Sequence, residues 1–251
     1  NDAFETVYFI TGNHDLFYRD KRELNSMEFA RDLDNFVMVD EIMEQGDCAI
    51  IPWLVGDEHK KVAKMQVKYM FGHFELPYFK MNAMVEMPDT GEIKADDFAN
   101  QEMVFTGHFH KRQQRKNIYY IGNAFPHNYA DAWDDERGMM TLEWGGEPEF
   151  IDWKDCPKYR TIPLSRLLDK TEEILAPNNL YLRVTLDIDI SYEEANFIKE
   201  NFSAQYDVRE ISLLPDANVD DEMNKMEPGE IDFESVDQIV TDQITKLDTE
   251  T

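Results

Sequence analysis

Three short motifs that contain histidine each follow a largely apolar segment. Gly-Asn-His-Asp occupies residues 12–15, Gly-His occupies residues 72–73, and Gly-His-Phe-His occupies residues 107–110. Imidazole is the commonest metal ligand among side chains, and the amide of Asn13 can add an oxygen ligand. A glycine at such a point lets the backbone turn sharply and leaves space around the ligands. Together the motifs predict a site for manganese, iron or zinc.

The chemistry expected of such a site is phosphoryl transfer. Two metal ions held a few ångströms apart can clamp the attacking and leaving oxygens of a phosphate ester. The chain has 25 basic and 52 acidic residues, a net charge of −27, so it lacks the surplus of lysine and arginine that phosphate binding usually requires. Bound cations would remove that objection. A single Gly-His is usually an ordinary turn, but the ordered set after apolar strands is a specific signal.

Apolar segments precede each motif and must position it. Residues 4–11, 67–71 and 102–106 each read as a strand that stops at the glycine. The other predicted strands are 36–40, 48–54, 117–121, 138–144 and 148–153, the last two as a β pair, and the predicted short helices are 22–35 and 57–66. Many short strands with some helices favour an α/β fold, a layered β-sandwich flanked by helices, with active groups at strand ends.

The character of the sequence changes near residue 155. Residues 180–190 and 206–214 read as strands, and the helix predicted between them, 191–202, opens with Ser191 as N-cap and Glu194 completing a capping box. This β-α-β unit predicts a small α+β capping domain. Residues 216–251 hold twelve acids and two bases, which is typical of a solvated linker, and 231–247 show helical spacing of apolar residues.

We therefore predict three parts: a catalytic domain over 1–153, the small domain over 154–214, and an acidic linker with a helical tail over 215–251. Cys48 and Cys156 are the only cysteines and form no CxxC pattern, which favours a reducing compartment, the cytoplasm. We find no signal peptide and no apolar run long enough to span a bilayer, so no membrane partner is expected.

The motifs resemble those of a known family. GNHD, GH and GHFH match the last three motifs of the calcineurin-like metallophosphoesterases. The small β-α-β unit that follows is similar to the SbcD-type exonuclease subunits of DNA repair complexes, among them the recombination endonuclease subunits of T-even phages. The segments IIPWL, FGHFEL and YIGNAF support this narrower resemblance, which covers roughly residues 5–150.

The resemblance implies a metal-dependent DNA exonuclease and endonuclease with two divalent cations, manganese first and magnesium as the alternative. The implied metal ligands are Asn13, His73 and His108 for one ion and His110 for the other. His14 would stabilise the transition state or protonate the leaving group, oriented by Asp15. For a phage protein the location would be the cytoplasm of the host cell.

The resemblance also implies partners. These are DNA, an SbcC-type coiled-coil ATPase, and a second copy of the chain in a homodimer within a heterotetramer, formed through helices near residues 16–35. The candidates for ATPase contact are Phe233, Val236, Ile239, Val240, Ile244 and Leu247; a helix folded back on its own domain or an acidic tail is the alternative. The candidates for DNA contact are Lys111, Arg112, Arg115 and Lys116, against an ordinary solvated hairpin. We expect His59 and His127 to be surface or structural residues.

The sequence departs from the family pattern in one respect. The first two family motifs, D-x-H and G-D-x-x-D, do not occur and are expected upstream of residue 1, so we expect the chain to be truncated and poorly active by itself. Two other functions stay open. One is another phosphoesterase, acting on small nucleotides or phosphoproteins. The other is a non-catalytic scaffold.

Overall fold

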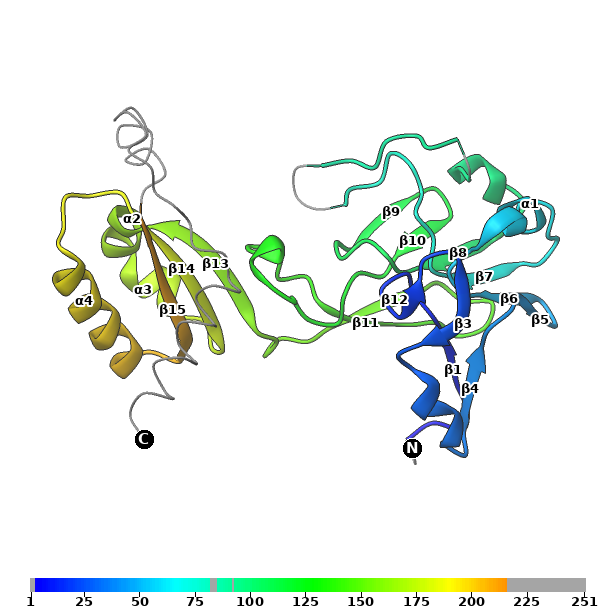
Figure 1. Ribbon diagram of the computed structural model, residues 1–251, viewed down its shortest axis with the longest axis horizontal. Coiled ribbons are helices and arrows are strands. Elements are labelled where there is room, and N and C mark those ends of the chain that lie inside the picture. The colour runs from blue at the N-terminus through cyan, green and yellow to red at the C-terminus, as the bar shows by residue number, and fades with distance from the viewer. Residues whose placement is uncertain (1–2, 82–84, 92, 216–251) are drawn as a thin grey trace, which may run out of the picture.

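The computed structural model describes residues 3–81, 85–91 and 93–215. A six-stranded sheet with the strand order β5-β6-β7-β8-β10-β9 lies at the centre of the larger part (Figure 1). Its strands are β5 (Met43–Gln45), β6 (Cys48–Ile51), β7 (Tyr69–Gly72), β8 (Met103–Thr106), β9 (Gln113–Arg115) and β10 (Ile118–Tyr120). The four inner strands are parallel, and the two edge strands run antiparallel to their neighbours.

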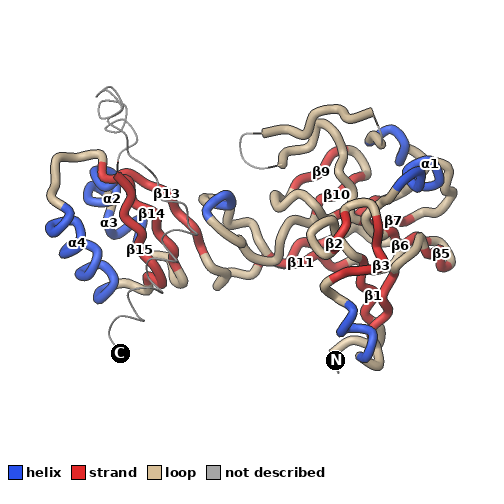
Figure 2. The backbone as a smooth tube through the Cα atoms, viewed as in Figure 1, coloured by secondary structure: helices blue, strands red, loops and turns tan. Residues whose placement is uncertain are grey.

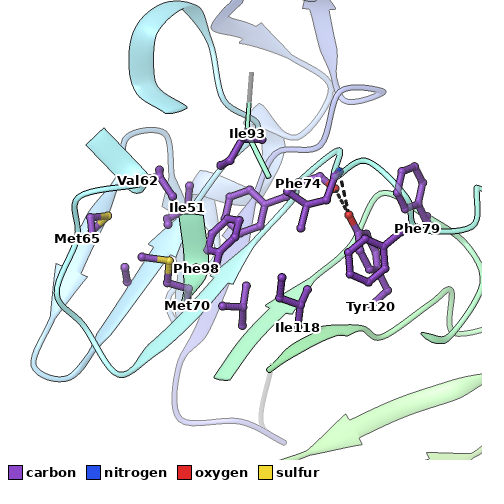
Figure 3. Packing of buried hydrophobic residues seen from close by; sticks show 14 of the residues in the cluster. Ile51, Val62, Met65, Met70, Phe74, Phe79, Ile93, Phe98, Ile118 and Tyr120 are labelled. Atoms are coloured by element: carbon purple, nitrogen blue, oxygen red, sulfur yellow. Dashed lines mark hydrogen bonds between the residues drawn. The ribbon is translucent and has the colours of Figure 1, made fainter. Parts of the chain in front are cut away.

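The central sheet is covered on both faces, as parallel sheets usually are. Alternate residues of the inner strands bury their side chains on one face against α1 (His59–Val62), the 3-10 helix η3 (Ala95–Phe98) and the loop after β7 (Figure 3). The opposite face carries a second cluster with Phe105 and Tyr119 at its centre, against which Met140 packs. Helices contribute little to either layer.

Two short ladders flank the central sheet. β1 (Val7–Ile10) pairs in parallel with β4 (Phe36–Val39), and the main-chain N–H of Trp53, just after β6, donates to the carbonyl of Thr11 at 2.8 Å. That bond fixes the end of β1 beside the end of β6. β11 (Gly138–Thr141) and β12 (Glu149–Asp152) form the predicted antiparallel pair, which is confirmed.

The helix predicted over residues 22–35 is wrong. The segment forms a hairpin of β2 (Leu16–Tyr18) and β3 (Lys21–Asn25), followed by the 3-10 helix η1 (Glu28–Asp32). Asn25 opposes the helix that the spacing predicts, because its side-chain oxygen accepts a hydrogen bond from the main-chain N–H of Met27 at 2.9 Å. Arg22 then anchors the hairpin by donating to the carbonyls of Asp40 and Trp53. Residues 16–35 therefore form no α-helix that could mediate the expected dimerisation, only the short 3-10 helix η1.

A three-stranded parallel sheet forms the smaller part, in the order β13-β14-β15 (Figure 2). Its elements are β13 (Lys158–Pro163), α2 (Leu164–Asp169), α3 (Thr171–Leu175), β14 (Leu180–Leu186), α4 (Tyr192–Gln205) and β15 (Val208–Pro215). The predicted β-α-β unit and its capping box are confirmed: the Ser191 hydroxyl accepts from the N–H of Glu194 at 3.2 Å. These elements enclose an apolar cluster of their own.

The observed fold is thus mixed α/β, with a multi-strand central sheet and few helices. The predicted ATPase-contact residues 233–247 lie outside the described residues. Cys48 and Cys156 are both free thiols. In the described part of the chain, no helix is long and apolar enough to cross a membrane.

Candidate active site

The parallel strands bring the three motifs to one edge of the central sheet. Gly72, the last residue of β7, pairs with Thr106, the last residue of β8, and the N–H of Gly107 donates to the carbonyl of Gly72 at 3.1 Å. His73 and His108 therefore leave the sheet side by side. The hydrogen bond between Trp53 and Thr11 brings the turn after β1 to the same edge. Carboxyl ends of parallel strands are where open α/β sheets place their ligands.

Three lone-pair atoms meet at this edge. Oδ1 of Asn13 lies 3.1 Å from Nε2 of His73 and 3.2 Å from Nδ1 of His108, and the two nitrogens are 3.3 Å apart. Two ligand atoms about 2.1 Å from one ion lie about 3.0 Å apart at a right angle and about 3.4 Å apart at the tetrahedral angle. The observed triangle falls between these limits, so these three side chains fit a divalent cation.

Both histidines of the triangle are neutral near pH 7. Burial lowers the pKa of His73 to about 3, with the charges of His108 and His14 acting in the same direction. Burial also lowers the pKa of His108 to about 4, assisted by the charges of His14, Arg19 and His110. A neutral imidazole keeps the lone pair that a metal ion requires.

The glycines of two motifs leave room for the His73 ring. A Cβ on Gly12 would lie 2.8 Å from Cε1 of that ring, and a Cβ on Gly107 would lie 3.0 Å from its Nδ1. The ring is therefore held between two backbone segments that only glycine allows to approach so closely. His108 itself has a φ of +82°, a left-handed conformation that costs a non-glycine residue energy and is common at functional sites.

Trp53 and Glu75 also contact the histidine pair, and sequence reasoning missed both. The Trp53 ring lies 5.5 Å from the His108 ring and 6.0 Å from the His73 ring, centroid to centroid, and is 9% exposed. A carboxylate oxygen of Glu75 lies 3.7 Å from Nε2 of His108. A carboxylate beside the second nitrogen of a ligating histidine orients the ring. The only sequence signal for Glu75 was its place two residues after His73.

The two residues predicted to be catalytic lie in the turn after β1. His14 is exposed, and its charge contributes to the low pKa of both His73 and His108, so its imidazole lies close to the triangle. The carboxylate of Asp15 accepts from the N–H of Gly12 at 2.7 Å. Within the described residues no hydrogen bond joins Asp15 to His14, so Asp15 shapes the turn rather than holding that ring.

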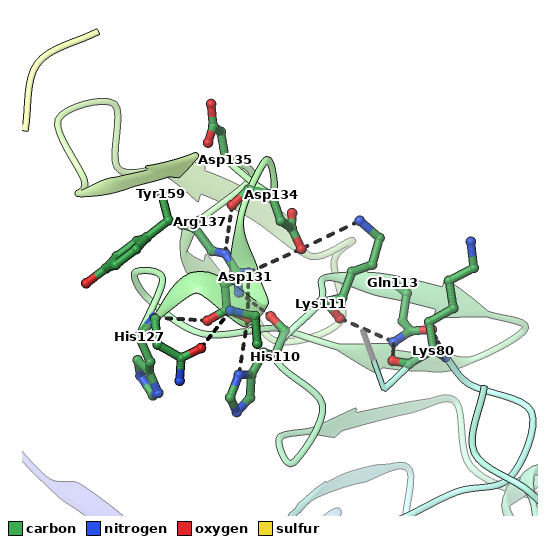
Figure 4. Close-up of polar contacts among 12 residues, drawn as sticks. Lys80, His110, Lys111, Gln113, His127, Asp131, Asp134, Asp135, Arg137 and Tyr159 are labelled. Carbon is green, nitrogen blue, oxygen red and sulfur yellow. Dashed lines mark hydrogen bonds and ion pairs between the residues drawn. The ribbon is translucent and has the colours of Figure 1, made fainter. Parts of the chain in front are cut away.

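His110 stands apart from the triangle. Its Nδ1 lies 3.3 Å from Oδ1 of Asp131, a buried carboxylate that also faces Arg137 (Figure 4). In the part of the chain that the structure describes, no three His, Cys, Asp or Glu side chains converge on one metal position. The triangle reaches three ligands only because an asparagine completes it.

The predicted DNA-contact residues each have a carboxylate partner. The ion pairs are Lys111–Asp134 at 3.5 Å, Arg112–Asp152 at 2.5 Å, Arg115–Glu86 at 3.3 Å and Lys116–Asp96 at 2.9 Å. A cation already neutralised within the protein contributes less to phosphate binding, because its counterion is a fixed side chain. This stretch of basic residues is therefore a paired surface in the free protein.

A cavity of about 460 Å³ opens beside His73. Arg19, Trp53, Phe74 and Ile93 are among its lining residues. Its volume falls within the range of small-ligand sites, about 300–1,000 Å³. A ligand in this cavity would contact the edge of the candidate metal site.

Comparison with known proteins gives a distant relationship. No model of a protein family matches the chain. Exonuclease subunit 1 of Enterobacteria phage T4 is 27% identical over 161 residues, which cover 60% of this chain and 46% of the phage protein. The chain thus spans about half the length of that relative. It is a distant relative of a phage exonuclease subunit.

Proposed function

We propose that the chain belongs to the nuclease subunit of a DNA recombination and repair complex and hydrolyses phosphodiester bonds in DNA with divalent metal ions. The triangle of Asn13, His73 and His108 carries the proposal, because its atoms have the separations of ligands on one cation. The relationship to a phage exonuclease subunit supports a nuclease rather than another use of that cation.

The metal ligands would be those that the calcineurin-like metallophosphoesterase resemblance implies. Asn13, His73 and His108 would hold one ion and His110 the second, with manganese the first choice and magnesium the alternative. Such ions would activate the attacking water and neutralise charge on the phosphate. The exposed imidazole of His14 would give its proton to the leaving oxygen.

The partners proposed with this function are DNA, an SbcC-type coiled-coil ATPase and a second copy of the chain in a heterotetramer, in the cytoplasm of the host cell. The support is that the phage relative is named as a subunit. We also propose that residues 154–214 form a separate small domain, because β13, β14 and β15 enclose a distinct apolar cluster.

A second candidate is a phosphodiesterase of small nucleotides. The cavity beside His73 favours it, because 460 Å³ is large enough for a mononucleotide to lie against the candidate metal site. Duplex DNA would use the open edge of the sheet instead. The two functions are therefore distinguished by substrate rather than by catalytic residues.

A nuclease assay tests the proposal. Linear duplex DNA and, separately, bis-p-nitrophenyl phosphate are incubated with manganese or magnesium. The proteins compared are this chain, any longer natural polypeptide that contains it, and their His14→Ala variants. Glu200→Ala, an exposed change on α4, is the control. Manganese-dependent DNA degradation that His14→Ala abolishes would establish the nuclease.

Two other outcomes redirect the assignment. Turnover of the small diester without DNA cleavage favours the small-nucleotide enzyme. No turnover by any polypeptide, with intact folding by circular dichroism, favours a non-catalytic scaffold. DNA degradation that persists in His14→Ala would remove that histidine from the mechanism.

A further inference from the structure

A second pair of imidazoles lies beside the candidate active site. The ring centroids of His110 and His127 are 5.2 Å apart with the ring planes at 60°, and those of His73 and His108 are also 5.2 Å apart, at 83°. Two imidazoles on one ion have centroids about 4.6 Å apart at a right angle and about 5.3 Å apart at the tetrahedral angle, for a metal–nitrogen bond of about 2.1 Å. Both pairs fall within this range.

One buried carboxylate fixes both members of the second pair. Oδ1 of Asp131 lies 3.3 Å from Nδ1 of His110, and Oδ2 accepts from the main-chain N–H of His127 at 2.9 Å. With Nδ1 donating to a carboxylate, the lone pair of His110 is on Nε2. The two rings project to the same side of the 3-10 helix η4 (Tyr129–Asp131), with Asp131 above them (Figure 4).

Asp131 is held in turn by Arg137, which is 1% exposed. Nη2 of Arg137 lies 3.4 Å from Oδ1 of Asp131 and 3.2 Å from a carboxylate oxygen of Asp134, and Nη1 donates to the carbonyl of His110. Arg137 and His110 engage Oδ1 of Asp131 and the N–H of His127 engages Oδ2, so Asp131 positions ligands instead of acting as one. A cation here would have two protein nitrogens, with water or phosphate oxygens completing its coordination.

We propose that His110 and His127 form a two-imidazole site for a divalent transition metal, with Asp131 as its positioning residue. Imidazole nitrogen suits zinc, copper, iron and nickel. Both rings are solvent-accessible, His110 with 40% of its side chain exposed, so a hydrated ion can enter. His127, which the sequence suggested was a surface or structural residue, becomes a ligand. The proposal shares His110 with the proposed nuclease but concerns metal binding alone.

Cobalt titration of the 251-residue chain tests the site, followed by calorimetry and by visible absorption. We expect two bound equivalents in the wild type. His127→Gln should weaken one of them about ten-fold or more and leave the other unchanged, and Asp131→Asn should weaken the same one about 10- to 100-fold. His73→Gln should weaken the other equivalent. His59→Gln, a half-buried histidine outside the pair, is the matched control and should titrate like the wild type.

Either of two results would refute the site. One is a single bound equivalent in the wild type, and the other is a His127→Gln titration that superimposes on that of the wild type. Because His127 is exposed, its substitution tests the proposal even if Asp131→Asn unfolds the chain. Failure of the nuclease assay with two cobalt sites intact would refute the proposed function and leave this inference standing. DNA cleavage with no cobalt bound at the His110–His127 pair would refute this inference and leave the proposed function standing.

Discussion

The hydroxyl of Tyr120 should support the candidate active site through two hydrogen bonds. Tyr120 is fully buried at the end of β10, and its hydroxyl donates to the carbonyl of Phe74 at 2.8 Å and accepts from the N–H of Leu76 at 3.1 Å. Both partners lie in the loop that follows His73 (Figure 3). Tyr120→Phe would remove both bonds and keep the ring packing against Phe79.

The expected loss follows from the two backbone groups left without partners. Each buried group that loses its hydrogen bond costs about 1–3 kcal/mol. The free energy of unfolding should therefore fall by about 2–6 kcal/mol for the two groups together. For a chain of this size, a loss of that order lowers the melting temperature by roughly 4–24 °C. The loop after β7 should loosen and weaken metal binding at His73.

Urea denaturation followed by fluorescence, with a cobalt titration of the same samples, measures both effects. Tyr119→Phe is the matched control. Tyr119 is the preceding residue, 8% exposed, on the opposite face of the sheet, and its hydroxyl makes no hydrogen bond to the described residues. A Tyr120→Phe protein within about 0.5 kcal/mol of wild type, or an equal loss in Tyr119→Phe, would refute the reasoning.

Three further predictions concern the triangle. Unfolded histidine takes up a proton near pH 6.5, whereas His73 and His108 stay neutral down to about pH 3 and pH 4, so acidification from pH 6.5 should destabilise the metal-free protein. Urea denaturation at pH 7, 6 and 5 measures the free energy of unfolding. As the pH falls, this free energy should decrease in the wild type by on the order of 1 kcal/mol per pH unit more than in a variant with glutamine at His73, and likewise for His108. Gly12→Ala should displace the His73 ring, because the added Cβ lies 2.8 Å from Cε1, and should weaken cobalt binding about ten-fold or more with the far-UV spectrum unchanged. Glu75→Gln removes the charge 3.7 Å from Nε2 of His108 and should weaken the same cobalt equivalent about ten-fold, and unchanged affinity would show that Glu75 does not orient the ring.

Local signals allowed much of the strand pattern to be predicted. Each apolar run that stops at Gly12, Gly72 or Gly107 contains a strand, and the strand ends within two residues of that glycine. The capping box of Ser191 and Glu194 marks the start of α4 correctly. These predictions succeed because apolar alternation, glycine and N-cap chemistry act over a few residues and need no knowledge of distant contacts.

Elsewhere, contacts between distant segments override local spacing. Residues 22–35 have helical spacing, but Arg22 bonds to the carbonyls of Asp40 and Trp53 and holds the segment as a hairpin. Arg115 looks available for phosphate, but Glu86 lies 3.3 Å away. Neither partner could be assigned from the sequence, because ion pairs depend on which loops the fold brings together.

The sequence by itself determined which residue types stand at the ends of which strands: an asparagine and four histidines, each beside a glycine turn. It could not determine that Asn13, His73 and His108 meet within 3.1–3.3 Å of one another while His110 turns to Asp131. Only the tertiary structure decided this. The parallel register of β7 with β8 and the single hydrogen bond between Trp53 and Thr11 set distances between residues far apart in the chain.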